Sequence, residues 1–247
     1  MSSLRSLVYD LPTRLFHWLF AGLFVTAYAI ANLAEHSPAF PFHMLAGLLL
    51  GGLLLLRLIW GVIGTRYARF GSFALSPRAL LDYFRGVFGG GGTRWHGHNP
   101  ASSWAALLMM ALAAALAVTG LLMATGDAEA YEDVHELLAN SFLVVALLHV
   151  TGVLVHTMRH RDGFPRSMVD GRKQDVPEED RIARTRPMIG LVTMVLVAGA
   201  GFLLWNGYDA NQGTLKIAGA TLQLGENEAG STVVATGGEH REDGDDD

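Results

Sequence analysis

The chain contains no cysteine among its 247 residues. This absence excludes disulfide-stabilised folds, covalently attached c-type haem and cysteine-ligated iron–sulfur clusters. It also excludes thiolate zinc sites and cysteine nucleophiles. Any metal site must therefore use other side chains, and the ten histidines are the first to consider.

Charge is scarce as well. Charged residues make up 17% of the chain, against about a quarter in ordinary soluble domains. The formal net charge is −5, so the chain lacks the excess of basic residues that would indicate a nucleic-acid partner. Apolar residues, by contrast, make up 51% of the sequence.

The apolar residues are gathered in five long stretches. A helix needs about 20 mostly apolar residues to cross a bilayer. Runs such as LAGLLLGGLLLLRLIWGVIG offer no polar face to water, which argues against buried helices of a soluble protein. The sequence therefore predicts an all-α integral membrane protein. The five predicted spans are Leu15–Ala34, His43–Gly64, Ser103–Thr125, His135–Thr157 and Met188–Trp205.

The basic residues lie almost entirely on one side of these spans. Of the 18 lysines and arginines, only Lys216 and Arg241 fall elsewhere. The short loops on the other side, Glu35–Phe42 and Gly126–Val134, contain no lysine or arginine. The positive-inside rule then predicts a cytoplasmic N-terminus and an external C-terminus, as an odd number of spans requires.

The segments outside the spans are short and polar. We expect an amphipathic helix over residues 76–88 and a cytoplasmic linker over 174–187. Residues 206–247 form a soluble tail after the fifth helix, residues 188–205. Within that tail we expect a hairpin over 214–224 and a disordered acidic end over 239–247.

Five histidines lie in or at the edge of the spans. Ionisable side chains are costly in a membrane and are therefore candidates for function. Carboxylates are nearly absent from the spans, which argues against a proton-relay pump. Imidazole suits haem iron, and two imidazoles on opposite faces of the ring leave an iron that mainly exchanges electrons. The five are His17, His43, His135, His149 and His156.

The depths of these histidines fall into two groups. His17 lies near the cytoplasmic end of the first span, whereas His43 and His135 open the second and fourth spans at the outer face. His149 follows His135 by 14 residues, which is about 21 Å of helix rise and close to whole turns. One helix face thus supplies a ligand to each of two stacked sites. His156, a heptad after His149, lies on the same face, and depth alone does not decide between the two.

Other classes of protein remain open on these residues. A histidine-lined metal-ion transporter would need ligands converging at one depth, whereas these are split by about 20 Å. A catalytically silent assembly or anchor subunit would bind no haem either, so a visible absorption spectrum, with two b haems per chain or none, separates a cytochrome from both. We expect the remaining histidines to be solvated or structural. They are His36, His96, His98, His160 and His240.

Several motifs resemble one known family. The residues that carry the resemblance are Val8-Tyr-Asp-Leu-Pro-Thr-Arg-Leu-Phe-His17-Trp18, His43-Met-Leu-Ala-Gly47 with Leu56-Arg57-Leu-Ile-Trp60-Gly61, Gly97-His-Asn-Pro100, Val118-Thr-Gly120, His135-Glu-Leu-Leu-Ala-Asn140 followed by His149, and Gly171-Arg-Lys173. Together they resemble the bacterial cytochrome b561 family, which includes the b-type cytochrome subunits of nickel–iron hydrogenases and relatives of formate dehydrogenase gamma subunits. The resemblance covers residues 8–173.

The resemblance implies a fold and a cofactor. The family fold is a four-helix bundle that holds two b haems, here residues 1–173, with the fifth helix and the tail outside it. Carried over by position, His17 pairs with His149 at the cytoplasmic-side haem, and His43 pairs with His135 at the outer haem. The resemblance thus favours His149 over His156. Arg14 and Arg57 are candidates to hold the anionic propionates of the inner haem.

The resemblance also implies a function. We expect a dihaem cytochrome of the bacterial inner membrane that carries electrons between a periplasmic partner and the quinone pool. The partner would be a c-type cytochrome or a dehydrogenase or hydrogenase module. The membrane lipid would contact the outer surface of the spans. An electron-transfer subunit is favoured over a stand-alone enzyme. The nearest alternative is a self-contained quinone-linked oxidoreductase, such as a superoxide oxidase.

Overall fold

Long helices dominate the structure, which is a computed structural model that describes residues 5–34, 37–89, 97–160, 164–174, 176–217 and 219–224. Five of them are long and apolar enough to cross a membrane, which confirms the all-α integral membrane fold. They are α1 (Leu11–Leu33), α2 (Phe40–Ile63), α4 (Pro100–Leu122), α5 (Ala128–His160) and α7 (Pro187–Gly207).

The starts of these helices follow from local sequence. Asp10 caps α1 and accepts a hydrogen bond from the backbone N–H of Thr13 at 2.8 Å. Asn99 caps α4 in the same way through Ser102 at 2.7 Å. Proline lies in the first turn of α1, α2, α4 and α7, where its missing N–H breaks no helical bond.

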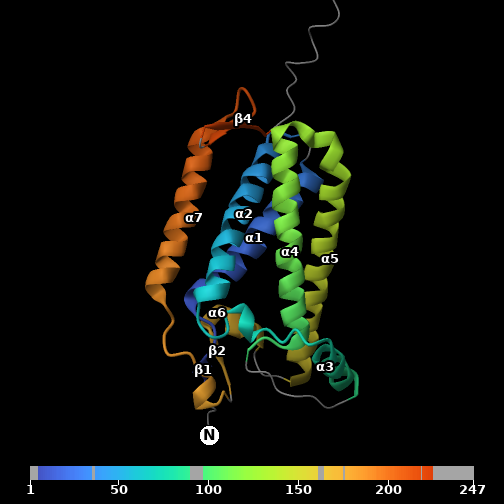
Figure 1. The fold of residues 1–247 in the computed structure, drawn as a ribbon, viewed down its shortest axis with the longest axis vertical. Helices are drawn as coiled ribbons and strands as arrows, with labels where there is room; N and C mark the ends of the chain where they lie inside the picture. Colours follow the sequence, from blue (N-terminus) through green and yellow to red (C-terminus); the bar gives the residue numbers. More distant parts are fainter. Residues whose placement is uncertain are drawn as a thin grey trace, which may run out of the picture.

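The helices form an up-and-down bundle with one addition (Figure 1). In sequence order, α1 packs on α2, α2 on α4, and α4 on α5. The fifth long helix, α7, lies outside this group and packs on α1 and α2. The side of α7 that faces away from the bundle is apolar and exposed, as expected of a surface in contact with lipid.

The connection between α4 and α5 differs from the sequence expectation. Residues 126–134 were expected to form a loop that ends where the fourth span opens at His135. Instead a short π-helical segment, η2 (Met123–Asp127), turns the chain at Gly126, whose φ of 126° suits glycine. Helix α5 then begins at Ala128, so His135 lies about two turns inside it.

One end of the bundle, here called the basic end, carries the N-terminus and most of the arginines. Strands β1 (Ser6–Leu7) and β2 (Arg172–Lys173) pair there in antiparallel fashion. Helix α3 (Pro77–Gly89) confirms the amphipathic helix expected over 76–88. The other short elements at this end are η1 (Phe70–Ser72), η3 (Phe164–Arg166), α6 (Ser167–Asp170) and η4 (Glu178–Asp180).

The opposite end, here called the hairpin end, is covered by a small sheet. Its strands are β3 (Tyr208–Asp209), β4 (Thr214–Ile217) and β5 (Ala220–Gln223), in the order β3-β4-β5, which confirms the expected hairpin. Leu215, Leu222 and Leu224 are buried in one cluster with Leu45 of α2 and Ala124 of η2. Residues 208–224 are thus packed on the bundle and are not a free tail. The expected acidic end, 239–247, lies outside the described residues.

Candidate functional site

Two of the membrane histidines face each other near the hairpin end. His43 lies in the first turn of α2, and His135 lies on α5. Their ring centres are 6.2 Å apart and the ring planes are inclined by 75°. Both side chains are half-buried. Two imidazoles from different helices are thereby placed as a pair.

The hydrogen bond of His43 determines which of its nitrogens is free. Its Nδ1 lies 2.8 Å from the backbone carbonyl oxygen of Ala27. A carbonyl can only accept, so Nδ1 carries the proton and donates. The lone pair of His43 is therefore on Nε2. This is the arrangement usual for a metal-ligating histidine, whose other ring nitrogen donates to an oxygen.

His135 is held in the same tautomer by a different acceptor. The hydroxyl of Thr119 lies 2.8 Å from Nδ1 of His135. The same hydroxyl donates its own proton to the carbonyl oxygen of Ala115 at 3.0 Å, with Leu116 as a second acceptor at 3.2 Å. When the hydroxyl donates to Ala115, its oxygen accepts from Nδ1–H of His135, and the lone pair of the ring is then on Nε2.

A small residue allows this histidine to lie against α4. A Cβ atom added at Gly120 would be 3.3 Å from Cε1 of the His135 ring, tighter than an ordinary contact. The reasoning from single residues did not single out Thr119 or Gly120. The only sequence signal for them was the Val118-Thr-Gly120 motif, which entered through the family resemblance.

An aromatic layer lies midway along the bundle, where α1 meets α5. Phe24 and Phe142 have ring centres 4.1 Å apart, and Phe20 stacks on Phe142 at 5.9 Å. Beside them, the hydroxyl of Tyr28 donates to the side-chain oxygen of Asn140 at 2.7 Å. Phe142 is seven residues from His135 and seven from His149 along α5. The layer therefore separates the two levels of histidines.

Two more membrane histidines lie toward the basic end. His17 lies in the second turn of α1, and His149 lies on α5, fourteen residues after His135. Both side chains are half-buried, and the His17 ring has the neighbouring Trp18 at its edge, 5.2 Å between ring centres. His156, one heptad further along α5, is also half-buried.

His98 lies just beyond this pair, in the loop before α4. Its ring contacts Tyr9 and Phe73, with ring centres 5.5 and 5.0 Å away. Burial lowers the pKa of His98 to about 3, and the nearby cations Lys173 and Arg57 act in the same direction. The imidazole is therefore neutral at pH 7, and its Nδ1 is buried without a hydrogen-bond partner. Of the two roles expected for this loop histidine, solvated or structural, its enclosed position fits the structural one.

The two arginines singled out in the sequence also lie at this end. Arg14 donates through Nη1 to the backbone carbonyl of Val169, while its Nε is buried without a partner. Arg57 lies over the Phe70 ring, 5.1 Å from the ring centre, and its Nη1 has no partner either. Each arginine therefore keeps an unused, buried donor.

Unpartnered donors are concentrated at the basic end. In the part of the chain that the structure describes, seven buried side-chain polar atoms lack a hydrogen-bond partner. Six of them can donate and belong to this end: Tyr9 Oη, Thr13 Oγ1, Arg14 Nε, Arg57 Nη1, Trp60 Nε1 and His98 Nδ1. Native proteins leave few such groups, so a cluster of them indicates that an acceptor-bearing group belongs there.

Comparison with protein-family models gives one match. The model for prokaryotic cytochrome b561 matches residues 8–171. The chain belongs to this family. No curated protein and no solved structure matched the chain.

Membership of the b561 family implies a b-type haem, and the residues present fit one. Haem offers iron to imidazole nitrogens and anionic propionates to donors and cations. The chain supplies paired histidines with a free Nε2 at the hairpin end and unused donors at the basic end. Across the described ranges, no three histidine, aspartate or glutamate side chains come together as a metal-ion cage would require.

The family match ends where two local features begin. It covers α1 to α6 and ends at Gly171, whose φ of 77° closes α6 in the left-handed conformation. Helix α7 and the sheet β3-β4-β5 follow outside the match.

Proposed function

We propose that this protein is a dihaem b-type cytochrome with one haem at each level of histidines. His43 and His135 would ligate the haem near the hairpin end, and His17 and His149 the haem near the basic end. The observation that carries the proposal is the pair of hydrogen bonds that leave Nε2 free on both His43 and His135. A bis-imidazole haem iron gains and loses single electrons without an open position for substrate.

The surrounding residues have supporting roles in this proposal. The Ala27 carbonyl and the Thr119 hydroxyl hold the protons on Nδ1 of the two hairpin-end histidines. Arg14 and Arg57 offer buried donors to the propionates of the basic-end haem. The layer of Phe20, Phe24 and Phe142 excludes water between the two levels.

We further propose that the basic end faces the cytoplasm of a bacterial cell and the hairpin end faces the periplasm. The concentration of arginines at the basic end supports this orientation. A reporter enzyme that is active only outside the cytoplasm, fused after residue 247, should then be active. Activity of a cytoplasm-only reporter at the same position would contradict the orientation.

Two haems at different depths suit electron transfer across the bilayer. We propose that electrons pass between a periplasmic partner, a c-type cytochrome or a dehydrogenase or hydrogenase module, and the quinone pool. A self-contained quinone-linked oxidoreductase, such as a superoxide oxidase, would act without that partner. Purification of the protein from its native membrane distinguishes the two by whether a redox subunit is retained.

Single substitutions of the histidines test the haem assignment. His43→Ala or His135→Ala should lose or perturb one haem, and His17→Ala or His149→Ala should affect the other. His156→Ala is the matched control on the same face of α5 and should keep both haems. Haem content per chain and redox titration are the measurements.

Each outcome has a clear meaning. Loss of a haem in His156→Ala, together with two unaltered low-spin haems in His149→Ala, would show that His156, and not His149, ligates the haem at the basic end. Two haems retained in both His43→Ala and His135→Ala would contradict the two-site proposal. A chain without any haem absorbance would leave an anchor subunit or a transporter.

A further inference from the structure

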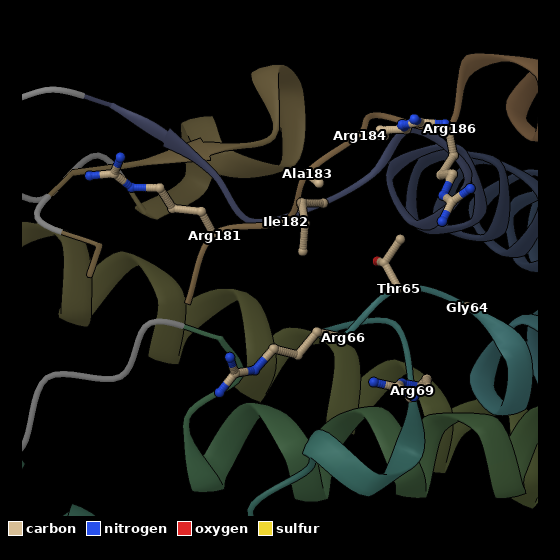
Figure 2. A pocket seen from close by; sticks show the side chains of 9 residues that line it. All are labelled: Gly64, Thr65, Arg66, Arg69, Arg181, Ile182, Ala183, Arg184 and Arg186. Atoms are coloured by element: carbon tan, nitrogen blue, oxygen red, sulfur yellow. The ribbon is translucent and has the colours of Figure 1, made fainter. Parts of the chain in front are cut away.

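A pocket of about 360 Å³ opens at the basic end, away from the histidines. Two segments face each other across it, residues 64–69 after α2 and residues 181–186 before α7 (Figure 2). No acidic side chain lines it. Its lining includes five arginines: Arg66, Arg69, Arg181, Arg184 and Arg186.

Two of these arginines are already engaged. Arg66 pairs with the carboxylate of Asp180 at 2.8 Å and donates to the carbonyl oxygen of Glu179 at 2.8 Å. Arg181 donates through Nε to the carbonyl oxygen of Val176 at 3.3 Å. By contrast, the guanidinium groups of Arg69, Arg184 and Arg186 have no partner within the described ranges. Three uncompensated cations thus line one concave surface.

The backbone adds to the positive character of the pocket. Helix α7 starts beside it with Pro187, and no side chain caps its first N–H groups. An uncapped helix N-terminus carries partial positive charge and offers N–H donors to an anion. Arg186, which precedes the helix, has a φ of 54°, a left-handed conformation that a non-glycine residue adopts only when its surroundings hold it.

The pocket lies at the depth where two spans end. Gly64 follows the last residue of α2, and Arg186 precedes the first residue of α7. The nearby apolar side chains Ile63 and Met188 are 69% and 70% exposed. A ligand bound at this place would contact the arginines with a polar group. Its apolar part would lie on the exposed apolar surface of the two helices.

We propose that this pocket binds the phosphate headgroup of an anionic phospholipid, whose acyl chains lie along α2 and α7. Guanidinium groups bind phosphate oxygens through paired N–H donors, and basic pockets between helices at a membrane face recognise anionic headgroups. Free phosphate shares the headgroup chemistry but lacks the acyl chains. The bound lipid would link α7, which lies outside the family match, to the end of α2.

Lipid titration followed by native mass spectrometry tests the proposal on the full chain in detergent. Phosphatidylglycerol should bind more tightly than zwitterionic phosphatidylcholine. The double variant Arg69→Gln/Arg184→Gln should bind phosphatidylglycerol about 25-fold more weakly, because each basic residue near an anionic lipid contributes a factor of about five. Arg78→Gln/Arg85→Gln on α3, which removes the same charge from the same end, should change the affinity less than about threefold.

Two further measurements separate the effect of charge from misfolding, and a lipid headgroup from free phosphate. Arg69→Lys/Arg184→Lys keeps the charge and should retain most of the binding, even if the glutamine variant folds poorly. Inorganic phosphate at millimolar concentration, without lipid, should bind far more weakly than phosphatidylglycerol. Equal loss in the α3 control, equal binding of the two lipids, or binding of free phosphate as tight as that of lipid would each overturn the proposal.

Discussion

The two ends of the bundle differ in the contacts they offer to the haems proposed above. At the hairpin end, the Ala27 carbonyl and the Thr119 hydroxyl orient the two histidine rings. At the basic end, the conspicuous feature is a set of donors without acceptors, including Arg14 and Arg57. The first end specifies the ligand nitrogens, and the second supplies positive charge and hydrogen bonds.

The ends also differ in how they are closed. The hairpin end is covered by an apolar sheet that buries Leu215 and Leu222 on Leu45. The basic end also has a buried apolar cluster, formed by Val8, Tyr9, Tyr67, Val176 and Ile182. It adds polar contacts, in which Asp10 accepts from Thr13 N–H and from the Thr65 hydroxyl at 2.6 Å. The predictions below test this difference.

The largest effect is expected from opening the apolar cover. Leu215→Ala should destabilise the docked sheet by about 2–5 kcal/mol, because the Leu215 side chain is fully buried and its removal leaves a cavity. Hydrogen exchange of the β4 and β5 amides measures this loss. Ile217→Ala, on the same strand but 39% exposed, is the control and should change stability by about 0.5 kcal/mol or less. Similar losses in both variants would show that the sheet does not depend on its apolar contact with the bundle.

The next effect concerns the orientation of His135. Thr119→Val keeps the shape of the side chain but removes the acceptor of Nδ1–H. Loss of such a supporting hydrogen bond typically costs about 10–100-fold in metal affinity, so haem should dissociate more readily from the hairpin end. The rate of haem loss, measured on dilution or by transfer of haem to apomyoglobin, tests this expectation.

The control for that experiment is Thr193→Val on α7. The Thr193 hydroxyl makes the same kind of bond to its own helix, donating to Ile189 at 3.0 Å, and it is equally buried. It contacts no histidine ligand, so haem retention should not change. If Thr119→Val also retains haem like the unaltered protein, the hydroxyl is not needed to orient His135.

A smaller effect is expected from removing one charge at the basic end. A cation near a haem favours the reduced iron, so Arg57→Gln should lower the reduction potential of one haem. We expect a shift of about 60 mV, which corresponds to a tenfold change for a one-electron couple. The other haem should keep its potential, as both should in Arg78→Gln. A uniform shift of the two potentials, or none, would contradict the assignment of Arg57 to the basic-end haem.

Sequence reasoning predicted the helices better than it predicted their supporting contacts. Hydropathy locates spans because each span is a continuous run, so four of the five were found within a few residues of their observed ends. The exception was the turn before α5, where polar residues 128–134 continue the helix beyond the apolar run. The chain reverses direction at Gly126, just before α5 begins, and hydropathy does not report the position of that turn.

The supporting residues could not be found from composition or spacing. Thr119 is one hydroxyl in an apolar span, and only the packing of α4 on α5 brings it to His135. The unused donors at the basic end come together only when the chain is folded, since they belong to three separate segments, residues 9–14, residues 57–60 and the loop that holds His98. His98 is the clearest case, because its loop position left a solvated and a structural role open, and only the fold shows that Tyr9 and Phe73 enclose it.

His98 gives the smallest and last effect, through the pH dependence of stability. Burial and the neighbouring cations place its pKa at about 3, against an ordinary value of 6.5. Between these values the unfolded chain binds a proton that the folded protein does not, so stability rises with pH there and is lost as the pH falls below about 6.5.

His98→Phe keeps a ring in the same enclosure and removes this dependence. The free energy of unfolding of this variant should therefore change less between pH 5 and 7, by up to about 1.4 kcal/mol per pH unit, than that of the unaltered protein. Melting temperatures at a series of pH values measure the difference. Identical pH profiles would mean that His98 is charged in the folded state, and the basic end would then hold an anion close enough to neutralise it.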